Sequence, residues 1–315
     1  MVILERRDRR GPILTPSSLP CLRDMPTINI TEGCAHGCSY CYTQGYSSFP
    51  GEGRVVLFDN IPELVRAELG RKRRCPRRVY FSPSSDAFQP LPDVQDVAHQ
   101  TISILLEWGI EVAFLTKGAL DERILALFAK TPKQVYAQVG ITTLDEHLWQ
   151  TFEPGAASPA ARLRNMESLA RIGVSTTARL DPLIPGLTDT EENLSTLLAE
   201  LRRREVRKIA ASYLFLRPAF AVRLAEQVHL LAGSACSPAS WSWGQLADGV
   251  GGGQMAAPET RRCGFERLRG LADNHGIELH VCACKNPDLA SAPGCLIAGP
   301  AQSSQPSREI PLFPE

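Results

Sequence analysis

The sequence predicts an α/β fold in which strands and helices alternate along most of the chain. Short apolar runs rich in β-branched residues recur between longer segments whose apolar residues follow helical spacing. A chain of 315 residues that is 43% hydrophobic and 22% charged has the composition of a globular protein with one large domain, or one domain and an appendage. Strands that alternate with helices pair in parallel through right-handed crossovers, so an open sheet and a barrel both satisfy the pattern.

Six strands are expected in order along the first two thirds of the chain. Each is a short run dominated by apolar or β-branched residues, at 27–30, 79–81, 112–115, 134–141, 174–180 and 209–215. The carboxyl ends of parallel strands form the edge of the sheet where ligands bind. Functional side chains are therefore expected in the loops that follow these strands.

Five helices are expected between the strands, at 61–69, 94–108, 121–129, 158–173 and 191–203. The second has its apolar residues on one stripe, and the third begins at an acidic cap, Asp121. The fourth begins with Ser158 as the N-cap and Pro159 in the first helical position, and Gly173 ends it.

The chain divides into four parts by composition. Residues 1–26 are polar, basic and proline-bearing and are interpreted as an extended N-terminal lead-in to a core at 27–225. Residues 226–298 are interpreted as a linker rich in glycine, serine and alanine, followed by a small C-terminal extension. Residues 299–315 are expected to form a disordered tail rich in proline and serine.

Composition and charge exclude several classes of protein. Lys and Arg number 34, as do Asp and Glu, so the zero net charge argues against a broad basic surface for nucleic acid. No run of about 18 apolar residues predicts a membrane-spanning helix, and the first residues lack the apolar core of a signal peptide. We therefore expect a cytoplasmic protein. In that reducing compartment, clustered cysteines bind metal or do redox chemistry more often than they form disulfides.

The first cysteine cluster is Cys34, Cys38 and Cys41, in a C-x3-C-x2-C spacing directly after the first expected strand. Three thiolates on one tight loop can bind three corners of a [4Fe–4S] cube and leave the fourth iron open to a ligand that is not protein. The spacing alone leaves two alternatives open, a zinc site completed by His36 and three free buried thiols.

With an aromatic residue before its last cysteine, this motif resembles that of the radical S-adenosylmethionine (SAM) enzymes. The resemblance implies a partial (β/α)6 TIM-like barrel, which agrees with the six expected strands. It implies that Cys34, Cys38 and Cys41 hold a [4Fe–4S] cluster whose open iron binds SAM, and that Tyr40 packs near the adenine. It further implies reductive cleavage of SAM, hydrogen abstraction from a substrate, and an electron donor such as flavodoxin or ferredoxin.

Other segments are similar to the spore photoproduct lyase-like (DNA repair photolyase-like) branch of this family. They lie at 33–42, 82–90, 115–117, 141–145, 152–155 and 183–187. One departure concerns the chemistry, because spore photoproduct lyases carry a cysteine hydrogen donor in the loop after the second strand, where this chain has Ser84 and Ser85. A serine hydroxyl is a much poorer hydrogen-atom donor than a thiol, so the resemblance does not carry the substrate with it.

The resemblance also implies roles for residues at the other strand ends. Ser84, Ser85 and Asp86 occupy the place where these enzymes bind the ammonium of SAM. Lys117 is a candidate for the carboxylate of SAM, and weaker candidates for its ribose or carboxylate are Thr142 and Arg179. The alternatives are a capped turn for Asp86 and a solvated side chain for Lys117.

A second cysteine group follows a helix expected at 260–275 and a strand expected at 278–281. It consists of Cys282, Cys284 and Cys295, with Cys263 upstream. Four thiolates could hold an auxiliary Fe–S cluster or a structural zinc ion. The alternative is a set of buried thiols that pack as small apolar residues.

The leading interpretation is a radical SAM enzyme that abstracts hydrogen from an unidentified substrate, with nucleic-acid repair and lyase chemistry among the open options. The alternative from another class is a non-catalytic Fe–S or zinc protein that acts as a redox sensor or nucleic-acid-binding module. Basic runs at 71–78, 202–208 and 261–262 could contact phosphates. We interpret them as solvated helix faces, so nucleic acid is an open but disfavoured partner.

Overall fold

The structure is a computed structural model that describes residues 2–17, 20–22, 25–217, 241–245 and 252–289, with single residues between 221 and 231. The tail expected at 299–315 and Cys295 lie outside these residues. Within the described part of the chain, no helix combines the length and the apolar character needed to cross a membrane.

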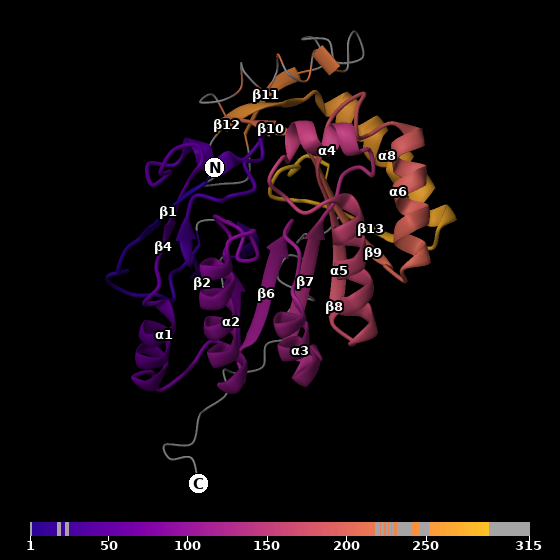
Figure 1. Ribbon diagram of the computed structural model, residues 1–315. Helices are drawn as coiled ribbons and strands as arrows, with labels where there is room; N and C mark the ends of the chain where they lie inside the picture. The colour runs from indigo at the N-terminus through magenta and orange to yellow at the C-terminus, as the bar shows by residue number, and fades with distance from the viewer. Residues whose placement is uncertain are drawn as a thin grey trace.

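Seven parallel strands form the central sheet in the order β13-β9-β8-β7-β6-β5-β2 (Figure 1). In chain order they are β2 (Thr27–Ile28), β5 (Arg78–Phe81), β6 (Glu111–Thr116), β7 (Val135–Gly140), β8 (Ser175–Leu183), β9 (Lys208–Tyr213) and β13 (Glu278–Val281). All six strands expected in the core are present, and the strand expected at 278–281 pairs with β9 as the seventh. The α/β class is confirmed, and the arrangement is that of a partial TIM-like barrel.

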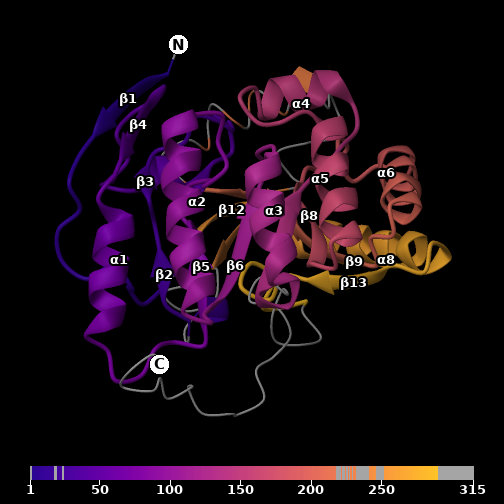
Figure 2. The same cartoon turned by 60° about the horizontal axis from the view of Figure 1, so that its bottom comes forward.

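Helices follow the strands as the alternation predicts. They are α1 (Ile61–Gly70), α2 (Pro92–Glu107), α3 (Glu122–Lys130), α4 (Glu146–Phe152), α5 (Pro159–Arg171), α6 (Glu191–Arg203) and α8 (Pro258–Asn274). Figure 2 shows α1, α2 and α3 side by side along the sheet. The expected caps are present, since Asp121 accepts a hydrogen bond from the N–H of Ile124 at 2.8 Å and Ser158 accepts one from the N–H of Ala161 at 3.2 Å.

The hydrophobic core lies between the sheet and these helices. Phe114 of β6 stacks on Phe128 of α3 with ring centroids 5.5 Å apart, and both side chains are almost fully buried. Val65 of α1 and Ile102 of α2 belong to the same core. Close packing of this kind fixes the strand ends and hence the loops that follow them.

A small sheet beside the start of the barrel was not expected from the sequence. Its strands are β1 (Ile3–Arg6), β3 (Thr31–Glu32) and β4 (Arg54–Leu57). β1 lies in the expected extended lead-in and pairs in parallel with β4, while β3 pairs with β4 in the antiparallel sense. These pairings tie the N-terminal residues to both ends of the loop that carries the first cysteine cluster.

A second small sheet, also not expected, consists of β10 (Phe215–Leu216), β11 (Trp241–Gln245) and β12 (Gly252–Ala256). β12 lies in the middle and pairs antiparallel with the other two strands. Because β10 begins two residues after β9 ends, this sheet lies at the carboxyl end of the large sheet, as Figure 1 shows.

Gly264→Ala is expected to lower the free energy of unfolding by about 1–3 kcal/mol, because α8 approaches Tyr213 too closely for a methyl group. A Cβ at Gly264 would overlap the Tyr213 hydroxyl and lie 2.7 Å from its Cζ. The ring cannot give way, since it is buried and its hydroxyl donates to Asp189 at 2.8 Å. The matched control is Gly270→Ala on the same helix, where a Cβ meets nothing within 4 Å. That substitution should raise the free energy of unfolding by about 0.5–1 kcal/mol. Urea unfolding of both variants measures the difference.

Candidate functional site

A cavity of about 520 Å³ lies at the carboxyl ends of β2, β5 and β6. The loops that follow these three strands form its wall, as parallel sheets predict. The predicted site residues that line this cavity are Cys34, Cys38, Cys41, Ser84, Ser85, Asp86 and Lys117. The structure therefore brings together the first cysteine cluster and the candidates from two other strand ends.

The cysteine loop, residues 33–42, has a shape that depends on a glycine and on one buried amide side chain. Gly33 has φ +77°, and a Cβ there would press on the carbonyl of Arg54 and lie 2.8 Å from Pro50 Cγ. Further along, the Ala35 N–H donates to Gln89 Oε1 at 2.7 Å. Gln89 is fully buried and follows β5, so it fixes the cysteine loop relative to the neighbouring loop.

Burial opposes ionisation of two thiols of this loop, Cys34 and Cys38. Burial, reinforced by the nearby Asp86 carboxylate, raises the pKa of Cys34 well above its usual value. Burial also raises the pKa of Cys38, to about 12. Three thiolates gathered at one cavity need compensating positive charge, and bound iron ions would supply it. Loading of this site with iron is therefore coupled to release of protons from the thiols.

Polar atoms in the cavity wall show that it suits a polar ligand. Among the described residues, His36 Nε2, Ser39 Oγ and Ser82 Oγ are buried without a hydrogen-bond partner, and all three residues line the cavity. A buried polar atom without a partner costs about 1–3 kcal/mol, which a ligand with matching donors and acceptors would remove. The cavity thus offers thiols that can bind iron and polar groups that can bind a small molecule. This combination fits an iron–sulfur cluster together with an organic cofactor.

Asp86 lies in the cavity wall, but protein donors surround its carboxylate. It accepts from the Thr116 hydroxyl at 2.9 and 3.0 Å, from the Phe88 N–H at 2.8 Å and from the Lys117 N–H at 2.7 Å. His36 Nδ1 lies 3.5 Å from the same carboxylate. These contacts show that Asp86 joins the loops after β5 and β6 and orients His36. Its predicted contact with an ammonium stays a prediction.

The two serines before Asp86 are also anchored. The Ser84 N–H donates to Asn29 Oδ1 at 3.0 Å, and the Thr31 hydroxyl donates to Ser85 Oγ at 2.8 Å. The loop leaves β5 through Ser82, which is buried with φ +52°, a conformation that non-glycine residues rarely adopt. This turn directs the loop across the cavity.

Lys117 carries positive charge into the cavity from the end of β6. Burial alone lowers its pKa, but Glu153, Cys38 and Asp181 outweigh that effect and the pKa is raised. Its Nζ lies 5.2 Å from the ring centroid of Tyr40. Its stem passes over Gly140, where a Cβ would lie 2.9 Å from Lys117 Cγ. In the described residues no carboxylate oxygen lies within 4.0 Å of Lys117 Nζ, the limit for an ion pair. The ammonium is therefore available to an anionic ligand.

Two buried charged residues beside the site were not singled out from the sequence. Glu153 and Arg162 form an ion pair whose side chains are 4% and 1% exposed. Glu153 also accepts a hydrogen bond from the Tyr40 hydroxyl. Glu153 lies in a segment quoted for the family resemblance, but only the structure shows that its partners are Tyr40 and Arg162.

Comparison with known proteins identifies the family of the chain. A family model for the radical SAM superfamily matches residues 28–198, more than half of the chain. The chain belongs to the radical SAM superfamily. An uncharacterised protein of Mycobacterium tuberculosis is 30% identical over 184 residues, which cover 56% of this chain and 54% of that protein. A radical SAM Nalpha-GlyT isomerase of Pseudomonas phage M6 is 28% identical over 199 residues, covering 62% of this chain and 40% of the isomerase.

The fold of this radical SAM protein is also that of spore photoproduct lyase. Spore photoproduct lyase in complex with a dinucleoside spore photoproduct superposes with a TM-score of 0.66 over 88% of this chain and 82% of the lyase. The sequence identity of 17% makes this a likeness of fold. The chain spans about half the length of the mycobacterial relatives that it matches.

Membership of the superfamily implies a [4Fe–4S] cluster and SAM, and the cavity described above fits both. Three predicted SAM contacts lie outside its lining residues. Tyr40 packs against a separate apolar cluster, the Thr142 carbonyl accepts from Asn193 at 2.9 Å, and Arg179 pairs with Asp181 at 2.8 Å. Their roles toward SAM stay predictions.

The described C-terminal cysteines differ in their exposure. Cys263 is exposed on α8 and lies 3.5 Å from Glu259 Oε1, whereas Cys282 is buried and Cys284 half-buried after β13. Across the described ranges, no three His, Cys, Asp or Glu side chains converge as they would around a single metal ion. This holds for the cysteine loop with His36 as well, and metal analysis decides between iron and zinc there. With Cys295 outside the described residues, the auxiliary cluster or zinc site stays a prediction.

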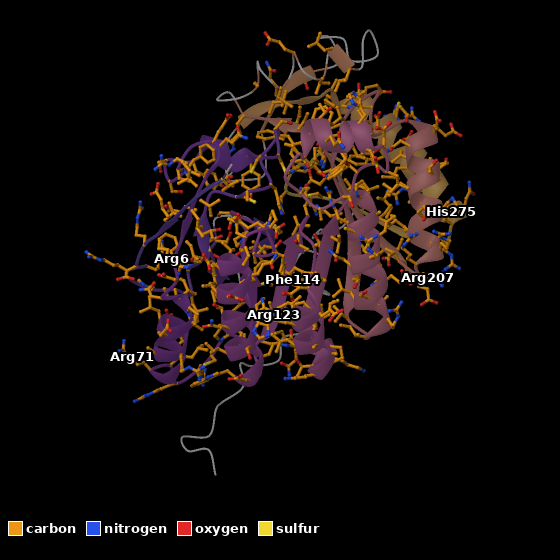
Figure 3. The ribbon with its side chains drawn as sticks, viewed as in Figure 1. Arg6, Arg71, Phe114, Arg123, Arg207 and His275 are labelled. Atoms are coloured by element: carbon orange, nitrogen blue, oxygen red, sulfur yellow. The ribbon has the colours of Figure 1, made fainter. Side chains whose placement is uncertain are left out.

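The basic runs at 71–78 and 202–208 lie before and at the start of β5 and β9, at the end of the barrel opposite to the cavity. Arg71 and Arg207 precede β5 and β9, and Figure 3 shows both at the periphery of the radical SAM barrel. Arg78 is buried, pairs with Glu111 at 2.6 Å and stacks on the ring of Tyr136 at 3.8 Å. Arg261 is buried as well. These residues do not form one continuous face around the cavity.

Proposed function

We propose that this chain is a radical SAM enzyme that abstracts hydrogen from its substrate. In this proposal Cys34, Cys38 and Cys41 hold a [4Fe–4S] cluster, and SAM binds beside it in the cavity. The observation that carries the proposal is that one cavity collects the three thiols, the Lys117 ammonium and several buried polar groups without partners.

When bound, the cluster and SAM would supply one-electron cleavage of the sulfonium bond and with it the means to remove hydrogen from a substrate. The protein's own residues would bind, orient and shield. Lys117 offers a cation for the carboxylate of SAM, and Asp86 fixes the loop that faces it. Tyr42, at the end of the cysteine loop, and Phe49 line the cavity and help to keep water out. The Tyr42 hydroxyl donates to the Pro83 carbonyl at 2.6 Å, which joins the two loops.

The names of two similar proteins support a proposal for the reaction class. One relative is named an isomerase and the fold neighbour is a lyase, and both reaction types leave the substrate with no net oxidation. We propose an isomerase- or lyase-type reaction on a substrate not yet identified, with electrons from a small donor such as flavodoxin or ferredoxin.

An anaerobic assay tests this proposal. The chain is reconstituted with iron and sulfide, its iron is counted, and 5′-deoxyadenosine is measured after SAM and dithionite are added. Roughly four irons per chain with deoxyadenosine support one cluster, and roughly eight support an auxiliary cluster as well. Iron without SAM binding would support the redox-sensor alternative, and bound zinc without iron would contradict the proposal.

Lys117→Met is expected to weaken SAM binding by about tenfold or more, because a charge-assisted contact is lost while the apolar stem is kept. Iron content should stay at the wild-type value, since Lys117 binds no iron in this scheme. Equilibrium dialysis with labelled SAM measures the affinity. The control is Lys130→Met, an exposed lysine at the end of α3, and equal SAM affinity in both variants would remove Lys117 from the site.

A further inference from the structure

The segment 152–157, which joins α4 to α5, contacts the cysteine loop through its backbone. The Ser39 N–H donates to the Phe152 carbonyl at 3.0 Å, and the Gly155 N–H donates to the His36 carbonyl at 2.9 Å. A Cβ at Gly155 would overlap the Ala35 carbonyl and lie 3.0 Å from that of His36. The two backbones therefore lie as close together as a glycine permits.

The same segment also reaches Lys117. The Ala157 N–H donates to the Lys117 carbonyl at 2.9 Å. Arg162, one turn into α5, donates to the Ala157 carbonyl at 2.7 Å and to the Gly140 carbonyl at the end of β7 at 3.0 Å. Residues 152–157, which we call the bridging segment, thus connect the cysteine loop to the ends of β6 and β7.

Glu153 is the charged centre of the bridging segment. Its buried carboxylate accepts from the hydroxyl of Tyr40, which lies between two of the cysteines, and pairs with Arg162. Lys117 approaches the ring of the same tyrosine at 5.2 Å. Arg162 pairs with Glu153 at contact distance, whereas the charges of Lys117 and Glu153 interact without an ion pair in the described part of the chain. One carboxylate thus fixes the tyrosine of the cysteine loop beside the cation of the cavity.

We propose that Glu153 is a positioning residue for SAM binding. Acting through Tyr40, it would hold the cysteine loop at a fixed distance from Lys117, so that the cluster and the cation could bind one SAM molecule together. The inference rests on the proposed function for its ligand, but the placement of the loop is a property of the chain without cofactor.

The test compares Glu153→Ala, Glu153→Gln and Tyr40→Phe with the wild-type chain. Glutamine keeps an acceptor for Tyr40 and serves as the conservative rescue. Phenylalanine removes the hydrogen bond but keeps the ion pair of Glu153 with Arg162. It therefore tests the proposal even if Glu153→Ala does not fold. The control is Glu167→Ala, which breaks an exposed ion pair with Arg171 on the same helix as Arg162.

Three sets of measurements are made on the 315-residue chain. Hydrogen exchange of the Ser39 and Gly155 amides is followed before reconstitution. Bound iron and the dissociation constant for SAM are measured after reconstitution. The KM for SAM and kcat are then obtained from deoxyadenosine formation.

Glu153→Ala and Tyr40→Phe are expected to speed exchange of the Ser39 amide by about tenfold, the scale of one lost hydrogen bond to a charged acceptor. They should raise the SAM dissociation constant and KM by a similar factor, with iron retained and kcat changed less than about threefold. Glu153→Gln should recover most of the SAM affinity.

A merely structural role would lower iron content and kcat per chain together and leave KM unchanged, and that result would overturn the proposal. Wild-type exchange of Ser39 in Tyr40→Phe would overturn it as well. If the wild-type chain does not cleave SAM, the proposed function fails, while the exchange data on the unreconstituted chain still decide whether Glu153 positions the loop.

Discussion

Cys38→Ala is expected to reduce deoxyadenosine formation by on the order of a thousandfold or more, to the background of the assay. Cys38 is buried in the wall of the cavity between the other two cysteines of its loop. With two thiolates left, the loop cannot hold three corners of a cube, so bound iron should fall well below four per chain. Iron analysis and chromatography of the SAM products check both parts of this expectation.

The matched control is Cys75→Ala, which removes another buried thiol. Cys75 belongs to the hydrophobic core and does not line the cavity. It should therefore keep wild-type iron and deoxyadenosine within about twofold and lose only the stability of one small apolar group, about 1 kcal/mol. If Cys38→Ala kept its iron and its product, the assignment of the cysteine loop as the cluster site would be wrong.

Most of the large sheet could be predicted because its strands are local apolar runs, and β6, β7 and β8 are each followed by a helix with an N-cap side chain. Asp121 and Ser158 illustrate this, since both were expected as caps from sequence and both accept the capping hydrogen bond. β3 escaped prediction because it consists of two polar residues, Thr31 and Glu32, that pair with β4 more than 20 positions later. β10 was not separated from β9, since the strand expected at 209–215 includes its first residue, Phe215. Periodicity cannot reveal such strands, since two residues carry no pattern.

The candidate site was predictable where one loop carries the pattern, and not where distant loops meet. The spacing of the three cysteines identified the cysteine loop, and the structure shows that its thiols share a cavity with Lys117. The sequence favoured a ligand role for Asp86, but it could not show that Thr116 and two backbone N–H groups surround that carboxylate. The contact of Glu153 with Tyr40 spans 113 positions in the sequence and has no local signal.

Arg162→Met is expected to lower the free energy of unfolding by about 3–5 kcal/mol at neutral pH, because it leaves a buried carboxylate without its partner. The Arg162 side chain is 1% exposed and pairs with Glu153, and it also donates to the carbonyls of Ala157 and Gly140. Methionine fills much of the same space but replaces none of these contacts. Urea unfolding of the metal-free chain measures the loss.

The pH dependence of this loss distinguishes a missing charge from a packing defect. In the wild type, burial raises the pKa of Glu153, but Arg162, Lys117 and the Tyr40 hydrogen bond outweigh it and the pKa is lowered. A carboxyl with a lowered pKa stabilises the fold above its unfolded pKa, and this contribution is lost as the pH falls through the folded pKa. Without Arg162 the pKa of Glu153 rises, so the ionised form opposes folding and the protonated form does not. The deficit of the variant should therefore be largest near about pH 7 and shrink toward about pH 5.

The control for this prediction is Arg171→Met, which breaks the ion pair with Glu167 on the outer face of α5. Those side chains are 70% and 48% exposed, so water screens their charges and the loss should stay below about 0.5 kcal/mol at either pH. An equal deficit for Arg162→Met at both pH values would mean that lost packing, not the charge of Glu153, dominates. A pH-dependent deficit confined to Arg162→Met would show that the barrel keeps this carboxylate ionised beside the cysteine loop only because a buried arginine balances it.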